Sequence, residues 1–259
     1  MVILKKIKKE KKMKKSLKKI LFTVLTVFAV FFVVACGNKE DSNINKEEVL
    51  KKNVEASNNI KSINKLATAK IELKSGESVE YMADISLIKD PFATKIVMDA
   101  GPENGKLTTF IKDGMMYVTS TEDDTWEQQA IPEETIEGYK NILNDSIEIY
   151  EVLKDNLDKV SIKEDGGNYI ISVTKNSDFL NKYIKTQMSD IVGGEDFEPN
   201  NSTLEYVIDK ETYFLKSLLI TFIAEVQGQK IKAKTETTFS NINNVEEIIV
   251  PEEALNSNN

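Results

Sequence analysis

The sequence predicts an α+β fold, a single domain in which a curved antiparallel sheet of half-barrel shape has helices packed across one face. Runs of alternating apolar and polar residues, which are typical of strands, fill two blocks near the beginning and the end of the chain. Amphipathic segments, with apolar residues three and four positions apart, precede the first block and separate it from the second. We find no internal repeat, so one domain accounts for this order.

The first amphipathic segment is predicted to be a helix from Lys46 to about Ile63 that lies with one face on another element. Segments rich in β-branched and aromatic residues follow, separated by turn residues. They predict about five strands, over residues 66–75, 79–89, 92–100 and a hairpin at 106–120. Asp113 and Gly114 supply the positive φ that the tight turn of this hairpin requires.

Alternation within the strands predicts which of their faces are buried. In residues 80–87 the buried set is Tyr81, Ala83, Ile85 and Leu87, and the solvated set is Glu80, Asp84 and Ser86. The closing block is predicted to contain strands over residues 202–209, 212–228 and 229–242. The last strand alternates strictly, whereas the middle one is apolar on both faces from Leu218 to Phe222. We therefore expect the middle strand to be covered on both sides.

Helices are predicted between the two blocks of strands. The first helical region begins at Pro132, whose fixed φ suits the first position of a helix, and breaks into two helices near Asn144. A hairpin follows, with its turn at Gly166 and Gly167. A further amphipathic helix, over residues 177–192, leads into the closing block.

A lysine-rich start precedes these elements and is followed by an apolar run of 16 residues, Ile20 to Ala35. Cys36, the only cysteine in the chain, comes next. This order is typical of a secretory signal peptide, and either Met1 or Met13 could open it. The run falls short of the roughly 17–25 apolar residues that span a bilayer, so an uncleaved signal anchor is the weaker interpretation.

Val33, Val34, Ala35 and Cys36 resemble the lipobox of bacterial lipoproteins. The resemblance implies that lipoprotein-processing enzymes attach a diacylglyceryl group, with acyl chains such as palmitate, to the Cys36 thiol and cleave the chain before it. A thiolate is a strong nucleophile, which explains why this chemistry needs a cysteine. A buried structural cysteine is the alternative interpretation.

The chain is thus predicted to have three parts: a signal peptide (1–35), a tether that begins with the lipidated Cys36 (36–45), and the α+β domain (46–255). The tether is polar and lacks periodicity, which is typical of a flexible segment. The predicted location is the extracytoplasmic face of the cell membrane, with the protein held there by its lipid anchor.

The net charge of the chain is −8, and residues 1–35 contribute +9, so the remainder carries about −17. Such an acidic surface repels nucleic acid and anionic lipid headgroups. We therefore expect no nucleic-acid partner and a membrane contact that depends on the acyl anchor.

The chain contains no histidine and no second cysteine. This inventory excludes Ser-His-Asp and Cys-His catalytic systems, histidine-based zinc sites and thiol redox pairs. No metal and no other cofactor is predicted. The acidic clusters at 122–124, 195–196 and 246–247 could bind Ca²⁺ or supply acid and base, but runs of this kind are usually solvated loops.

The element order, the opening segment KKNVEASNNIKSINKLATAKIEL and the closing segment TFSNINNVEEIIVPEEA resemble a group of Gram-positive lipoproteins of unknown function. That group is related to the LolA, LppX and LprG lipid carriers, and the resemblance covers residues 46–253. It implies a half-barrel sheet wrapped around helices, with an apolar cavity that takes acyl chains.

A hydrophobic ligand site is predicted where the apolar stripe of the helix at 177–192 meets the sheet. Its candidate residues are Phe179, Tyr183, Met188 and Phe222. Flexible thioethers such as that of Met188 suit apolar pockets, but ordinary core packing explains the same residues.

The sequence therefore predicts a non-enzymatic, membrane-anchored lipoprotein that binds a lipid or an acyl chain between its sheet and its helices. A different class is a protein-binding sensor or scaffold module of the cell envelope, which would expose an apolar patch. The third class is an enzyme, of which a glycosidase that uses only carboxylates is the version that the residue inventory permits.

Overall fold

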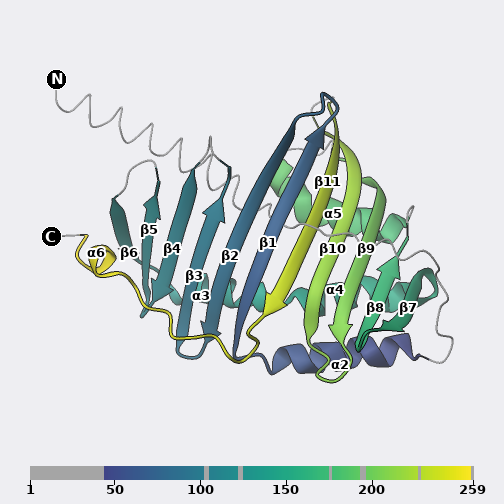
Figure 1. Ribbon diagram of the computed structural model, residues 1–259, viewed down its shortest axis with the longest axis horizontal. Helices are drawn as coiled ribbons and strands as arrows, with labels where there is room; N and C mark the ends of the chain where they lie inside the picture. The colour runs from purple at the N-terminus through teal and green to yellow at the C-terminus, as the bar shows by residue number, and fades with distance from the viewer. Residues whose placement is uncertain are drawn as a thin grey trace.

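The computed structural model describes residues 44–101, 105–121, 125–174, 177–192, 197–226 and 229–257. Of residues 188–192 and 226 it describes the backbone alone. The described residues form one domain, a large curved antiparallel sheet of 11 strands that does not close, together with five α-helices (Figure 1). The predicted fold class is confirmed.

Six strands belong to the first block and five to the second. The strands of the first block are β1 (Ser62–Leu73), β2 (Ser78–Lys89), β3 (Phe92–Asp99), β4 (Lys106–Lys112), β5 (Met115–Ser120) and β6 (Trp126–Ala130). Those of the second block are β7 (Val160–Asp165), β8 (Asn168–Val173), β9 (Asn200–Asp209), β10 (Leu215–Val226) and β11 (Gln229–Ser240). The α-helices are α2 (Lys46–Asn58), α3 (Glu133–Lys140), α4 (Asp145–Leu153), α5 (Asp178–Val192) and α6 (Glu252–Leu255), with 3₁₀ turns η1 (Asn141–Leu143) and η2 (Lys154–Lys159).

The two blocks of strands join at the centre of the sheet. The strand order is β6-β5-β4-β3-β2-β1-β11-β10-β9-β8-β7, so β1 pairs with β11 and the edges are β6 and β7. β6 and β7 are consecutive along the chain, and therefore the connection between them has to cross the whole sheet. This connection contains α3, η1, α4 and η2.

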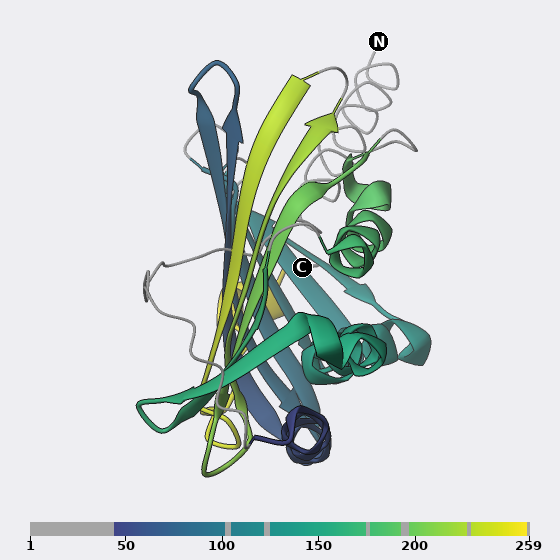
Figure 2. The same ribbon diagram turned by 90° about the vertical axis from the view of Figure 1, so that its right-hand side faces the viewer.

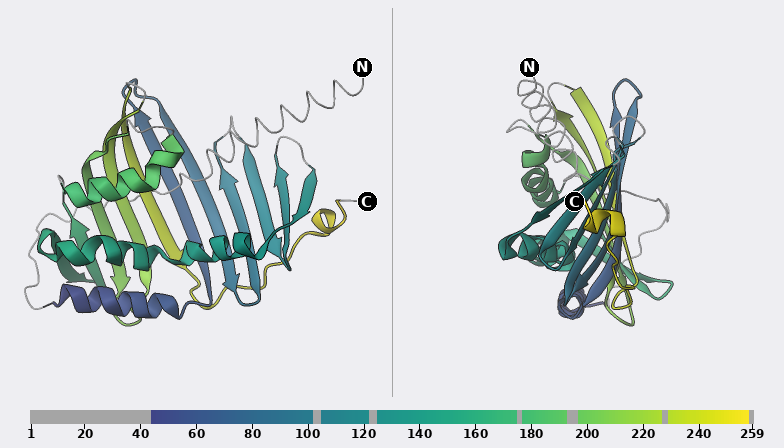
Figure 3. Two further views of the ribbon diagram at one scale, coloured as in Figure 1. Left: turned by 180° about the vertical axis from the view of Figure 1, so that it is seen from behind. Right: turned by 90° about the vertical axis from the view of Figure 1, so that its left-hand side faces the viewer.

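The helices α2 to α5 lie on one side of the sheet, which we call the helix side (Figure 2). Seen from behind, α3 and α4 cross the lower part of the sheet and α5 lies over β9 to β11 (Figure 3). The main core fills the space between α2, α4, α5 and the strands β7 to β11. Its fully buried side chains include those of Leu50, Ile149, Leu153, Ile171, Leu180, Tyr206 and Ile208.

The opposite side, which we call the outer side, carries a smaller core on the first block of strands. Phe110 and Tyr117 lie there beneath the C-terminal segment, which contributes Ile248 and Val250. The Lys112 ammonium donates a hydrogen bond to the Ile248 carbonyl at 2.9 Å and so holds this segment to β4. The chain after β11 therefore covers apolar surface that the helices do not reach.

The opening helix was predicted to continue to about Ile63, which is farther than it extends in the structure. The structure ends α2 at Asn58, and the backbone N–H of Asn59 closes its last turn. Ile60 and Ile63 are buried as the pattern implies, but they belong to the following turn and to β1. Apolar residues three positions apart fit the end of a helix and the start of a buried strand equally well.

Two further expectations on strands need correction. The first block has six strands, because the polar segment Trp126–Ala130 forms the edge strand β6, which no alternation of apolar residues announces. On β10, Leu218 and Phe222 are buried on the helix side, whereas Leu219 on the outer side is half-buried. Leu219 lies opposite Glu236, whose aliphatic stem can cover it without a second layer of helices.

The predicted turns and the helix break are confirmed. Asp113 and Gly114 have φ of 52° and 74°, and they join β4 to β5 in a two-residue turn. Gly166 and Gly167 likewise have positive φ between β7 and β8. Asn144 separates η1 from α4. Within the described residues, no helix combines the length and the apolar character needed to cross a membrane.

A buried polar contact docks α2 on the sheet. Tyr206 of β9 donates its hydroxyl proton to the Asn53 side-chain oxygen, and the Asn53 amide donates to the Tyr213 carbonyl at 2.8 Å. Asn53 and Tyr206 are both fully buried. Each group would be costly to bury alone, so the contact fixes one position of α2 along β9.

We predict that Asn53→Ala lowers the free energy of unfolding by about 2–4 kcal/mol, because the Tyr206 hydroxyl and the Tyr213 carbonyl lose their partner inside the core. Urea unfolding measures the change. Asn58→Ala makes the same substitution on the exposed side of α2 and is the matched control. Equal stability of the two variants would contradict the docking role.

Candidate functional site

The helix side of the central strands carries a floor of small residues. Ala67 and Ala69 of β1 and Ala83 of β2 form a cluster of their own, each at most 6% exposed. Ala67 is the register partner of Ala83 on one side and of Thr237 of β11 on the other. We call Ala67, Ala69 and Ala83 the alanine floor.

Half-buried apolar side chains surround this floor. Tyr81, Ile85 and Met98 pack against the three alanines. All members of this cluster are sheet residues, and among the described residues no helix contributes a side chain to it. Seen from behind, the end of α5 reaches β1, and the upper parts of β3 to β5 carry none of the described helices (Figure 3). The sheet thus presents an apolar surface with small side chains at its centre and larger ones around it.

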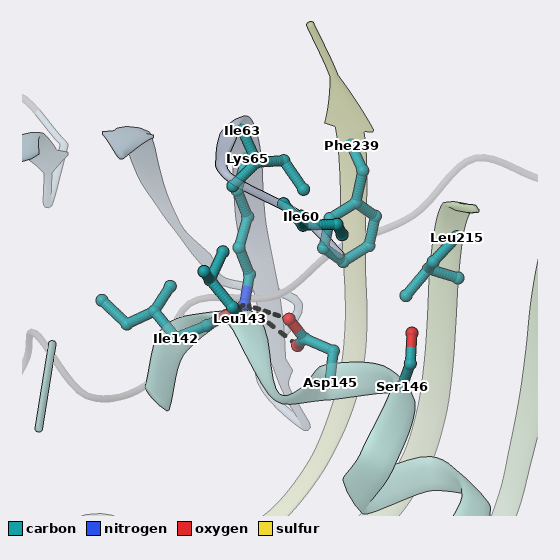
Figure 4. A pocket seen from close by; sticks show the side chains of 9 residues that line it. All are labelled: Ile60, Ile63, Lys65, Ile142, Leu143, Asp145, Ser146, Leu215 and Phe239. Carbon is teal, nitrogen blue, oxygen red and sulfur yellow. Dashed lines mark hydrogen bonds and ion pairs between the residues drawn. The ribbon is translucent and has the colours of Figure 1, made fainter. Parts of the chain in front are cut away.

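A small pocket lies next to the floor, where the sheet meets the helix connection (Figure 4). Its interior volume is about 10 Å³, which is close to the minimum for one water molecule. Its lining residues are Ile60, Ile63, Lys65, Ile142, Leu143, Asp145, Ser146, Leu215 and Phe239. The pocket is therefore too small for a lipid, and it marks the junction that holds the helices to the centre of the sheet.

Lys65 and Asp145 form a buried ion pair at this junction (Figure 4). The Lys65 ammonium lies 2.9 and 2.8 Å from the two oxygens of the Asp145 carboxylate, and it donates to the Ile142 carbonyl at 3.3 Å. The two side chains are 7% and 14% exposed. The ammonium also lies 5.7 Å from the centre of the Phe239 ring. These contacts attach the start of α4 to β1.

Two tyrosines near this junction stay neutral. Burial raises the pKa of Tyr206 and that of Tyr183, and nearby carboxylates raise the pKa of Tyr183 further. Burial also raises the pKa of Tyr81, beside the alanine floor. A phenol already keeps its proton at neutral pH, and burial holds the proton on these tyrosines to higher pH still. Tyr206 uses its hydroxyl proton in the bond to Asn53.

The predicted ligand residues fall in the main core. Phe222 is 2% exposed and meets the Phe197 ring edge-on at 5.8 Å, while Phe179 and Tyr183 are half-buried against the same cluster. The side chain of Met188 lies outside the described residues. The structure thus brings Phe179, Tyr183 and Phe222 to one interface between α5 and the sheet, and their binding of a ligand stays a prediction.

Most of the other predicted sites lie outside the described residues. These include Cys36, the lipobox residues before it and the acidic clusters at 122–124 and 195–196. In the remaining acidic cluster, Glu247 is exposed and pairs with Lys112 at 3.1 Å. Within the described part of the chain, no group of three or more Asp, Glu or Cys side chains could hold a metal ion.

The sequence analysis did not predict the alanine floor or the ion pair, although the sequence contains one indication of each. The alternation in residues 80–87 already placed Tyr81, Ala83 and Ile85 on one buried face. Lys65 stands at an alternating position between Ile63 and Ala67, where a lysine would have to be buried. The partner Asp145 is far along the chain, so no local pattern pointed to it.

The fold and the site define a class of proteins in which an open, curved antiparallel sheet carries helices on one side and an apolar surface beside them. The chain belongs to DUF6612, a family of unknown function, which it matches over residues 45–259. No curated protein matches the chain.

Three solved structures are similar to this chain. The lipoprotein LppX of Mycobacterium tuberculosis has 12% identity and a TM-score of 0.38, with 79% of this chain and 100% of that chain covered. MucB in complex with MucA has 10% identity and a TM-score of 0.31, with 81% and 61% covered. A LolA superfamily protein of Nitrosomonas europaea has 6% identity and a TM-score of 0.27, with 80% and 96% covered. At these values the likenesses carry no argument about a ligand.

We predict that Lys65→Met lowers the free energy of unfolding by about 3 kcal/mol, because Asp145 keeps a largely buried charge without its cation. The double variant Lys65→Met/Asp145→Leu should recover most of this loss. Glu72→Gln breaks the exposed pair with Lys232 and should cost at most about 1 kcal/mol. Urea unfolding of wild type, Lys65→Met, Asp145→Leu and the double variant measures the coupling, with Glu72→Gln as the control. A coupling near zero would refute the role of the pair.

Proposed function

We propose that this protein is a membrane-anchored, extracytoplasmic lipoprotein that binds a hydrophobic ligand, a lipid or an acyl chain, between its sheet and its helices and catalyses no reaction. The observation that carries the proposal is the alanine floor. It is an apolar cluster on the helix side of the sheet to which no described helix contributes a side chain.

The shape of this surface suits an extended chain of methylene groups. The alanine side chains at its centre are short, while Tyr81, Ile85 and Met98 supply contacts at the sides. Burying a methylene group contributes about 0.8 kcal/mol, so a chain of ordinary fatty-acid length gains enough to bind. The Met98 thioether adapts to chains of different shape.

A protein-binding module is the second candidate, because the C-terminal segment exposes two large apolar side chains. Ile249 is 71% exposed and Leu255 is 50% exposed. Both lie on the segment that follows β11 and covers the outer side of the first block of strands. A protein partner would contact this segment and would not need the alanine floor.

We predict that residues 37–259, which contain the whole described domain, retain lipid when purified from a Gram-positive host. Native mass spectrometry followed by organic extraction should show one lipid per protein. Ala69→Phe places a large ring on the floor and should abolish retention, whereas Thr68→Phe places it on the outer side and should not.

Circular dichroism of both variants checks that they fold. Folded wild-type protein that carries no lipid and binds no fluorescent acyl probe would overturn the proposal and favour the protein-binding module. Equal retention by the two variants would place the ligand away from the alanine floor.

The anchor is testable by substitution of the cysteine. We predict that Cys36→Ala accumulates as a precursor of full length, because the thiol that receives the diacylglyceryl group is missing. Mass spectrometry of membrane and soluble fractions measures cleavage and acylation. Ser42→Ala, in the predicted tether, should be processed like wild type. Normal maturation of the Cys36 variant would refute the lipobox.

A further inference from the structure

A buried hydroxyl without a partner lies at the border of the alanine floor. Thr237 of β11 is fully buried, and its Oγ1 makes no hydrogen bond within the described part of the chain. It is the register partner of Ala67 on β1 and of Leu218 on β10. Because Thr237 alternates with the outward Thr238, its side chain belongs to the helix side.

The same side of the sheet holds a second such group. Ser202 of β9 is also fully buried, and its Oγ lacks a partner among the described residues. An unpaired buried hydroxyl costs about 1–3 kcal/mol, and most buried polar groups in proteins are paired. A valine at position 237 would fill nearly the same space without this cost. The hydroxyl at Thr237 therefore suggests a partner outside the described part of the chain.

The charges around the floor restrict the chemistry of this partner. At the helix-side positions of β1, β10 and β11, Lys65 is the single cation among the described residues. Both oxygens of Asp145 already lie within 2.9 Å of its ammonium. A free carboxylate laid on the floor would find no cation to compensate its desolvation, whereas a neutral carbonyl needs only a donor.

We propose that the site takes an acyl chain in neutral, ester- or amide-linked form, with its methylenes on the alanine floor and its carbonyl oxygen accepting a hydrogen bond from Thr237 Oγ1. Register partners on neighbouring antiparallel strands have Cα atoms about 4.5–5.5 Å apart, so the hydroxyl is within reach of a chain that lies over Ala67. This inference rests on the proposed function and specifies its ligand: a neutral acyl lipid and not a free fatty acid.

The test measures the affinity of residues 37–259 for three single-chain probes with the same fluorophore and chain length: a fatty acid methyl ester, the corresponding alkyl methyl ether and the free fatty acid. Wild type should bind the ester about 2- to 10-fold more tightly than the ether, since one hydrogen bond distinguishes them. The free fatty acid should bind least well at neutral pH.

Thr237→Val should remove the preference for the ester and leave the affinity for the ether unchanged. Without ligand, this variant should melt at a temperature at least as high as that of wild type, because the unpaired hydroxyl is gone. Thr238→Val makes the same change one residue later, on the outer side, and should keep the preference. Thr237→Ser keeps a hydroxyl at this position and should keep the preference. Thr237→Ala also lacks the hydroxyl and takes the place of the valine variant if that variant does not fold.

The outcomes separate this inference from the proposed function. If no probe binds wild type, the proposed function fails and the inference fails with it. If the probes bind but ester and ether bind equally, or if Thr237→Val keeps the ester preference, the inference alone is overturned. Binding of the free fatty acid as tightly as the ester would overturn the neutral ligand class.

Discussion

The pairing of β1 with β11 is the constraint on which the rest of the structure depends. It joins a strand from the beginning of the domain to one from its end, in register from Asn64 opposite Ser240 to Leu73 opposite Ile231. Without it, the two blocks of strands would be separate sheets. With it, consecutive strands β6 and β7 become opposite edges, so the connecting helices are drawn across one side of the sheet.

Because of this topology, different elements cover the two sides of the sheet. The helices bury the helix side of β7 to β11, and the C-terminal segment buries part of the outer side of the first block. On the helix side of β1 to β3, the helix connection covers the lower part through Ile142, Leu143 and Asp145. The alanine cluster beside it consists of sheet residues alone within the described part of the chain. The alanines are at most 6% exposed, but Tyr81, Ile85 and Met98 keep part of their apolar surface in water. A bound hydrophobic ligand would remove that part from water.

The parts of this structure that local patterns control could be predicted from the sequence, and the parts that depend on register could not. The turn at Asp113 and the alternation from Tyr81 to Leu87 follow from residues that are neighbours in the chain, and the structure contains both. The polar edge strand β6 escaped prediction because an edge strand can form from backbone hydrogen bonds without an apolar face. The contact of Ala67 with Thr237 escaped it because that contact depends on the β1–β11 register.

The ion pair of Lys65 and Asp145 connects the topology to the chemistry of the site. A buried ion pair contributes little net stability compared with apolar residues of the same size, so its presence calls for another explanation. It attaches the helix connection to the central strand at one position, since the ammonium also reaches the Ile142 carbonyl. At the same time it neutralises the lysine of β1 that shares the helix side with the alanine floor. An internal carboxylate at this place competes with any anionic ligand for the same ammonium, and the neutral surface that results is suited to uncharged acyl groups.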